Sequence, residues 1–137
     1  FFCGATLARW VKQGHEVHYC LLTCGDKGSE DREKTADQIC QIRHTEQRGA
    51  ATISVATSVM FLDAPDGYLV PSMEMRRSGV RIIRQEKPDI LVTCDPTNLF
   101  PSGGYRLNHP DHRYAGQVVL DAVFPAAGNI HCKVGRP

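Results

Sequence analysis

Apolar residues recur at two different spacings along the chain, and the alternation of these spacings predicts the order of its elements. Helical spacing is present over residues 3–13, 31–51 and 72–86, and again from residue 109 onward. Short apolar runs, typical of parallel strands covered on both faces, are present at residues 17–23, 58–62 and 89–94. Helices that alternate with such strands indicate βαβ units. We therefore expect an α/β protein with a Rossmann-like, three-layer αβα arrangement, a mainly parallel sheet and a single domain over residues 1–137.

The second predicted helix contains charged residues where its apolar stripe should continue. Extending the stripe of Ile39 and Cys40 by three and four positions leads to Arg43 and Glu46. Two interpretations are open. The pair can be a surface ion pair, which contributes little to stability, or the arginine can be held toward a cleft by its neighbouring carboxylate.

Composition narrows the class of protein. The 137 residues are 42% hydrophobic and 23% charged, which is typical of one globular domain. The net charge of +1 gives no electrostatic reason to expect binding to nucleic acid or to an anionic membrane. The sequence contains no apolar run of the roughly 18 residues that a membrane-spanning helix needs. Six cysteines without a C-x-x-C pair fit a reduced, cytoplasmic protein, in which we interpret Cys20 and Cys24 as small buried hydrophobic residues.

Polar residues follow each predicted strand. Asp26 comes after the first strand, Asp66 after the second and Asp95 after the third, and the segment 109–112 follows further along. In parallel sheets, ligands bind in the crevice at the carboxyl ends of the strands. We therefore expect these residues to lie along one rim, although each Asp-Gly pair is also an ordinary turn sequence.

The segment His109-Pro110-Asp111-His112 is the strongest candidate for chemistry. Proline favours the first turn of a helix, so His109 is expected at the N-cap and His112 on the same helix face. Neutral imidazole from His112 suits Zn²⁺. The other histidine would then face a substrate carbonyl as an oxyanion donor or supply a proton, with Asp111 fixing its tautomer. The alternative is a capping histidine beside a surface histidine.

Seven short segments together resemble one family, the LmbE-like or PIG-L deacetylases. The resemblance runs in order from residue 1 to about residue 124. The segments that carry it are 2–9, 14–17, 23–28, Arg43-x-x-Glu46, 65–67, 88–93 and 109–112.

The resemblance implies a zinc-dependent hydrolase that removes the acetyl group from an N-acetylglucosamine conjugate. Family members carry a His-Pro-Asp-Asp segment with two zinc ligands and a general base, which would end about two residues ahead of Phe1. The remaining zinc ligands are therefore expected just upstream of Phe1. This implies an incomplete domain, truncated at both ends, within a longer parent protein, and a fragment that is itself inactive.

The resemblance also implies roles for individual residues. His112 corresponds to a zinc ligand, and His109 to the oxyanion-stabilising histidine with Asp111 as its partner. Arg43 and Asp95 correspond to contacts with sugar hydroxyls. The implied partner is a small amino-sugar conjugate rather than nucleic acid, a homo-oligomer is compatible with this, and no membrane span is expected.

Two alternatives remain open from the sequence. One is a non-catalytic, carbohydrate- or partner-binding Rossmann-like domain that lacks the metal. The other is part of a glycosyltransferase in which Asp95 or Asp26 contacts a nucleotide-sugar metal, although such a transferase has no need for the histidine pair.

Overall fold

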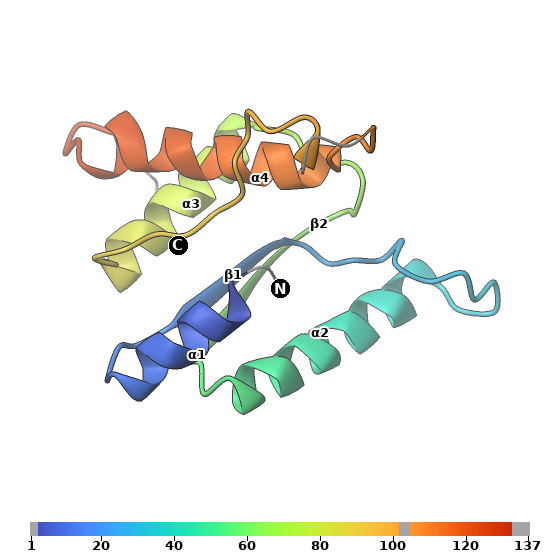
Figure 1. The fold of residues 1–137 in the computed structure, drawn as a ribbon. Helices are drawn as coiled ribbons and strands as arrows, with labels where there is room; N and C mark the ends of the chain where they lie inside the picture. The colour runs from blue at the N-terminus through green and yellow to red at the C-terminus, as the bar shows by residue number, and fades with distance from the viewer. Residues whose placement is uncertain (1–2, 102–104, 133–137) are drawn as a thin grey trace. The chain divides into compact units, whose positions relative to one another are not determined.

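The computed structural model describes residues 3–101 and 105–132, which form two compact units divided between Asp66 and Gly67 (Figure 1). The first unit contains α1 (Gly4–Lys12), β1 (His18–Thr23), α2 (Ala36–Ile53) and β2 (Ser58–Ala64). The second unit contains α3 (Met73–Glu86), α4 (Pro110–Asp121) and a distorted helical segment, η2 (Ala122–Ala127).

In the first unit, β1 and β2 pair in parallel, with α2 as the connection between them (Figure 1). The register runs from His18 opposite Ser58 to Leu21 opposite Phe61. It then shifts, so that Thr23 lies opposite Ala64 and β2 contains an extra residue at this point. The parallel pairing confirms the expected α/β class.

Helix α2 begins at a well-formed cap. The Thr35 side chain accepts a hydrogen bond from the Gln38 N–H, and the Gln38 side chain accepts one from the Thr35 N–H. This reciprocal pair satisfies two backbone donors that the first helical turn leaves free. The helix therefore begins at Ala36 rather than at residue 31, where the predicted pattern started.

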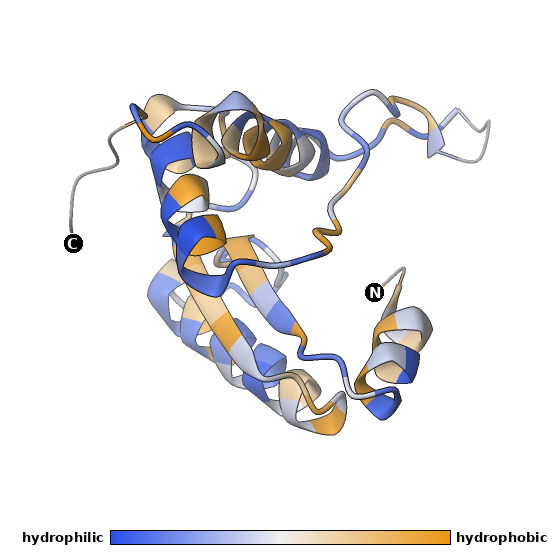
Figure 2. Cartoon of the chain, turned by 90° about the vertical axis from the view of Figure 1, so that its left-hand side faces the viewer, coloured by the Kyte–Doolittle hydropathy of each residue, from blue (hydrophilic) through white to orange (hydrophobic). Residues whose placement is uncertain are grey.

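The buried face of α2 differs from the predicted one. Ile39, His44 and Ala51 are its buried residues, whereas Arg43 and Glu46 are exposed. The prediction that Arg43 and Glu46 lie on the inward stripe was therefore wrong. The buried face of α2 instead includes His44, whose ring stacks on Phe61 of β2 with 4.0 Å between the ring centroids. Figure 2 shows the contrast in hydropathy, with orange bands on the strands and a largely blue α2.

The second unit packs its helices around a small apolar core. Val80, Ala122 and Ala126 are buried together, with Ile83 and Cys132 packed against them. Arg84 of α3 donates hydrogen bonds to four backbone carbonyls of the segment after α4, those of Ala126, Ala127, Asn129 and Cys132. A single side chain therefore satisfies several carbonyls that follow the last full helix.

The predicted third strand, residues 89–94, is not formed. A strand requires hydrogen bonds to a neighbour, and within the described ranges these residues pair with no strand. Ile90 and Val92 are more than half exposed. The apolar run is therefore irregular rather than a strand. Among the helices described, none combines the length and apolarity needed to cross a bilayer.

Candidate functional site

His109 and His112 lie together at the start of α4, as the sequence predicted. His109 is the N-cap, Pro110 occupies the first turn, and the two exposed imidazole rings have centroids 5.6 Å apart. The Asp111 N–H donates to His109 Nδ1 over 3.2 Å. A neutral imidazole that accepts at Nδ1 carries its proton on Nε2. His109 therefore presents an Nε2–H donor, the group that stabilisation of an oxyanion requires.

The Asp111 carboxylate is buried and fixes a loop rather than the imidazole. Its Oδ2 accepts from the Gly67 N–H over 2.6 Å, and its Oδ1 accepts from the Leu69 N–H over 3.3 Å. Both oxygens thus bind backbone amides. The expected contact between the Asp111 carboxylate and a histidine ring is therefore not formed. The backbone N–H of Asp111, rather than its carboxylate, holds the His109 ring.

Asp95 lies on the exposed segment before α4. Its Oδ1 accepts from the backbone N–H and the hydroxyl of Thr97, at 2.8 and 2.7 Å, and these hydrogen bonds lower the pKa of the Asp95 carboxyl. The neighbouring Cys94 carbonyl approaches α4 at Gly116, where an added Cβ would lie 2.2 Å from the oxygen. Asp95 therefore keeps a charged, accessible carboxylate on a segment that α4 packs against.

Arg43, in the first unit, holds the loop that follows β1. Its Nη1 donates to Glu46 over 2.7 Å, and its Nη2 donates to the Gly28 carbonyl. Its side chain also packs against Gly25, where an added Cβ would lie 3.3 Å from the arginine Cγ. The Arg43–Glu46 ion pair is present at exposed positions, and the Arg43 guanidinium reaches the glycine-bracketed loop 25–28.

Asp26 joins the loops that follow β1 and β2. Its Oδ1 accepts from the Asp66 N–H over 2.8 Å, and its carboxylate also contacts Lys27 and the Cys24 thiol. The hydrogen bond from Lys27, with the Asp66 amide next in importance, lowers the pKa of this buried carboxyl. The carboxyl ends of the two strands therefore meet at one edge of the sheet, as the parallel arrangement predicted.

A cluster that the sequence interpretation missed lies between α2 and β2. His44 Nε2 is 2.8 Å from Asp63 Oδ1 and 3.7 Å from Cys40 Sγ. The three ligand atoms lie within 4.8 Å of one another, so these residues could hold a metal ion. The available signal was the Cys-x-x-x-His spacing, which places both side chains on one helix face. The spacing alone does not show that the two side chains meet Asp63, because Asp63 lies on a different element.

Zinc, which the family resemblance implies, fits the histidine pair in donor type but not in donor number. Imidazole is an appropriate ligand, yet a catalytic zinc site needs three protein ligands. Within residues 3–101 and 105–132, the group of three potential ligands is the Cys40–His44–Asp63 cluster, which does not include His112. Cys20 is exposed, so its interpretation as a buried hydrophobic residue was wrong.

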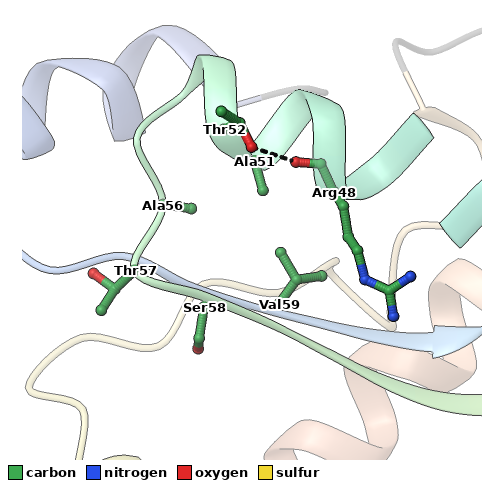
Figure 3. Close-up of a pocket in the computed structure, with 7 residues that line it drawn as sticks. All are labelled: Arg48, Ala51, Thr52, Ala56, Thr57, Ser58 and Val59. Carbon is green, nitrogen blue, oxygen red and sulfur yellow. Dashed lines mark hydrogen bonds between the residues drawn. The ribbon is translucent and has the colours of Figure 1, made fainter. Parts of the chain in front are cut away.

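The structure also contains an open hollow at the end of α2 (Figure 3). It is lined by Arg48, Ala51, Thr52, Ala56, Thr57, Ser58 and Val59. The Thr52 hydroxyl donates to the Arg48 carbonyl over 3.0 Å, within the helix. None of the predicted site residues lines this hollow, so it does not form part of the candidate site.

Comparison with known proteins agrees with the family resemblance. The model of the family described as PIG-L, GlcNAc-PI de-N-acetylase, matches residues 1–123. Diacetylchitobiose deacetylase of Thermococcus kodakarensis is 34% identical over 88% of this chain and 43% of its own length. A 1D-myo-inositol 2-acetamido-2-deoxy-alpha-D-glucopyranoside deacetylase of Segniliparus rotundus is 30% identical over 98% of this chain and 49% of its own length.

A solved structure gives the same result for the fold. The N,N'-diacetylchitobiose deacetylase from Pyrococcus horikoshii superposes with a TM-score of 0.81 at 28% identity, covering 90% of this chain and 44% of that protein. This chain thus spans about half the length of the relatives it matches. Because the match to the family model extends through both units and includes the His109–His112 segment, the chain belongs to the PIG-L family of de-N-acetylases.

Proposed function

We propose that the protein carrying this chain is a hydrolase that removes the N-acetyl group from an N-acetylglucosamine conjugate. The observation that carries the proposal is the match to the PIG-L family over residues 1–123. Relatives named as deacetylases of amino-sugar compounds support the substrate class. The match extends through both compact units, which supports treating residues 1–137 as parts of one domain.

In this proposal, His109 stabilises the oxyanion that forms when the acetamide carbonyl is attacked. The hydrogen bond from the Asp111 N–H to Nδ1 supports this role, because it leaves the Nε2–H free to donate. Asp111 acts through His109, as a positioning residue at the start of α4. Arg43 and Asp95 are proposed to contact sugar hydroxyls. The Arg43 guanidinium donates to the loop after β1, and the Asp95 carboxylate accepts from Thr97 in the segment before α4.

We propose Zn²⁺ as the cofactor, with His112 as one ligand and the other ligands supplied from outside the described residues. When bound, such an ion supplies an activated water and polarises the scissile carbonyl. The exposed imidazole of His112, next to His109 on one helix face, supports this assignment. We also propose a cytoplasmic location, because the described cysteines are free thiols and such thiols persist in reducing compartments.

His109→Ala, made in the protein at its full natural length, tests the catalytic role. We expect kcat for acetate release from N-acetylglucosamine conjugates to fall by about 10²- to 10³-fold, the typical effect of losing one oxyanion donor. The zinc content should not change, because His109 is not a proposed ligand. Acetate release and bound zinc are measured on the same samples.

His15→Ala is the matched control, since it removes an exposed histidine of α1's flanking turn. Unchanged turnover in zinc-loaded His109→Ala would remove the role of His109. A zinc-free, folded wild-type protein that binds amino sugars without releasing acetate would instead favour a non-catalytic carbohydrate-binding domain.

A further inference from the structure

Three potential metal ligands converge in the first unit, on residues that have no role in the proposed deacetylation. Cys40 and His44 lie one turn apart on α2, and Asp63 lies near the end of β2. Their ligand atoms Sγ, Nε2 and Oδ1 lie within 4.8 Å of one another. We propose that Cys40, His44 and Asp63 bind a divalent cation of the zinc class, which joins α2 to β2. The proposal does not depend on the proposed function.

Two of the three side chains face one ring nitrogen of the third. Both Cys40 and Asp63 face the same nitrogen, His44 Nε2, at 3.7 and 2.8 Å. A neutral Nε2 either donates its proton to Asp63 or accepts one from the Cys40 thiol, but it cannot do both. In a nucleophilic Cys–His–Asp arrangement the two partners use different ring nitrogens. The geometry therefore does not fit such a triad, whereas the three ligand atoms are close enough together to share one cation.

The donor set selects the class of metal. Thiolate, imidazole and carboxylate are the protein ligands of Zn²⁺, at about 2.3, 2.0 and 2.0–2.2 Å, which separates the ligand atoms by roughly 3–4 Å. The separations in this cluster are close to that range. A thiolate disfavours Mg²⁺ and Ca²⁺, which prefer oxygen ligands. On binding, the Cys40 thiol loses its proton to solvent and donates the resulting lone pair to the metal.

The His44 imidazole is held in place before any metal arrives. The His44 side chain is 9% exposed and its ring stacks on Phe61, which the Arg48 guanidinium covers at 5.0 Å from the ring centroid. Asp63 has φ of +53°, in the left-handed region that few residues other than glycine adopt. It also lies within the register shift of β2. Bulges and such backbone strain are concentrated beside functional sites.

A fourth ligand position at such a site remains for water.

Co²⁺ titration of the 137-residue chain tests the site directly, because Co²⁺ reports its ligands by absorption. We expect one Co²⁺ per chain, a near-ultraviolet thiolate-to-metal charge-transfer band and displacement by Zn²⁺. Zn²⁺ should also raise the Tm, because it binds the folded state. Absence of the charge-transfer band in the folded wild-type chain would overturn the proposal.

Variants identify the ligands. Cys40→Ala should abolish the charge-transfer band, and His44→Gln should weaken Zn²⁺ binding by about 100-fold, since even an outer-shell group is worth about 10- to 100-fold. Cys20→Ala and His15→Gln remove an exposed thiol and an exposed histidine as matched controls and should bind normally. Circular dichroism without metal establishes that each variant is folded.

His112→Ala separates this site from the proposed catalytic zinc. Binding by the 137-residue chain should be unaffected in this variant. A charge-transfer band that persists in folded Cys40→Ala, or binding that is lost in His112→Ala, would overturn the assignment. Either result would leave the deacetylase proposal to be decided by its own turnover measurement.

Discussion

The carboxylate of Asp111 connects the start of α4 to a loop far away in the sequence. It accepts hydrogen bonds from the backbone amides of Gly67 and Leu69, which lie 44 and 42 positions earlier in the chain. Asp111 and Leu69 are both buried. The buried Leu69 amide needs an acceptor, because water does not readily replace the carboxylate there, whereas Gly67 is exposed.

Asp111→Ala is therefore expected to destabilise the chain by about 1–3 kcal/mol, the typical cost of leaving one buried donor, here the Leu69 N–H, unpaired. Urea unfolding of the 137-residue chain measures this loss. Asp89→Asn alters an exposed carboxylate and is the control, with an expected change near zero. A loss for Asp111→Ala as small as that of the control would show that the loop does not depend on this carboxylate.

His44 shows why the sequence indicated only part of the candidate metal cluster, the spacing of Cys40 and His44. Its neighbours in the sequence are polar, and the local pattern gives no reason to bury it. Burial depends on Phe61 and Asp63, which only the pairing of α2 with β2 brings to the imidazole. The His109–His112 pair was predictable because proline and helical spacing are local signals.

At the scale of elements, two glycines in helices have opposite roles. Gly49 lies in α2, where an added Cβ meets nothing within 4 Å. Gly116 lies in α4, where an added Cβ would lie 2.2 Å from the Cys94 carbonyl oxygen and 3.0 Å from the Pro96 ring. Gly116 permits close approach of the Cys94–Pro96 backbone to α4. Gly49 has no such role and only adds conformational freedom to the unfolded chain.

Alanine substitutions at the two glycines should therefore change stability in opposite directions. Gly49→Ala is expected to stabilise the chain by about 0.5–1 kcal/mol through helix propensity. Gly116→Ala is expected to destabilise it by about 1–3 kcal/mol, because backbone atoms must move to make room. Chemical denaturation of both variants under the same conditions gives the comparison, and a stabilising Gly116→Ala would contradict the packing described for α4.

The segment 89–94 shows that an apolar sequence pattern is not enough to predict a strand. Its apolar run has the composition of a strand, but a strand exists only with a hydrogen-bonded neighbour. Helices satisfy their backbone internally, so the helical spacings led to α1, α2, α3 and α4 with small shifts at their ends. The strand prediction depended on a neighbour that a local pattern does not specify.

For the molecule as a whole, Asp26 contributes to the dependence of stability on pH. Hydrogen bonds from Lys27 and from the Asp66 amide lower the pKa of its carboxyl in the folded state. A group with a lowered folded pKa stabilises the protein above its unfolded pKa, and this stabilisation is lost as the pH falls through the folded value. The connection between the loops after β1 and β2 should therefore weaken in acid.

Asp26→Asn should remove this contribution. The difference in urea midpoint between the wild type and Asp26→Asn is expected to be largest near neutral pH. It should shrink as the pH falls below the ordinary carboxyl value of 3.8, because the wild-type carboxyl is then protonated as well. Asp37→Asn, at an exposed position of α2, is the control. A difference that stays constant over this range would exclude ionisation of Asp26 as its source.

Read alone, the sequence indicated the α/β class, the order of the helices, two of the strands and the position of the histidine pair at a helix start. These features follow from spacing, proline and capping residues, which act over a few neighbouring positions. The family was also readable from short motifs in order along the chain.

Which polar side chains are buried, and what they contact, followed from the three-dimensional packing. It placed Arg43 on the loop after β1, Asp111 on a distant loop and His44 between Cys40 and Asp63. The physical reason is that burial and hydrogen-bond partners depend on residues dozens of positions apart. A local pattern does not encode them, whereas the packing of a helix against a strand does.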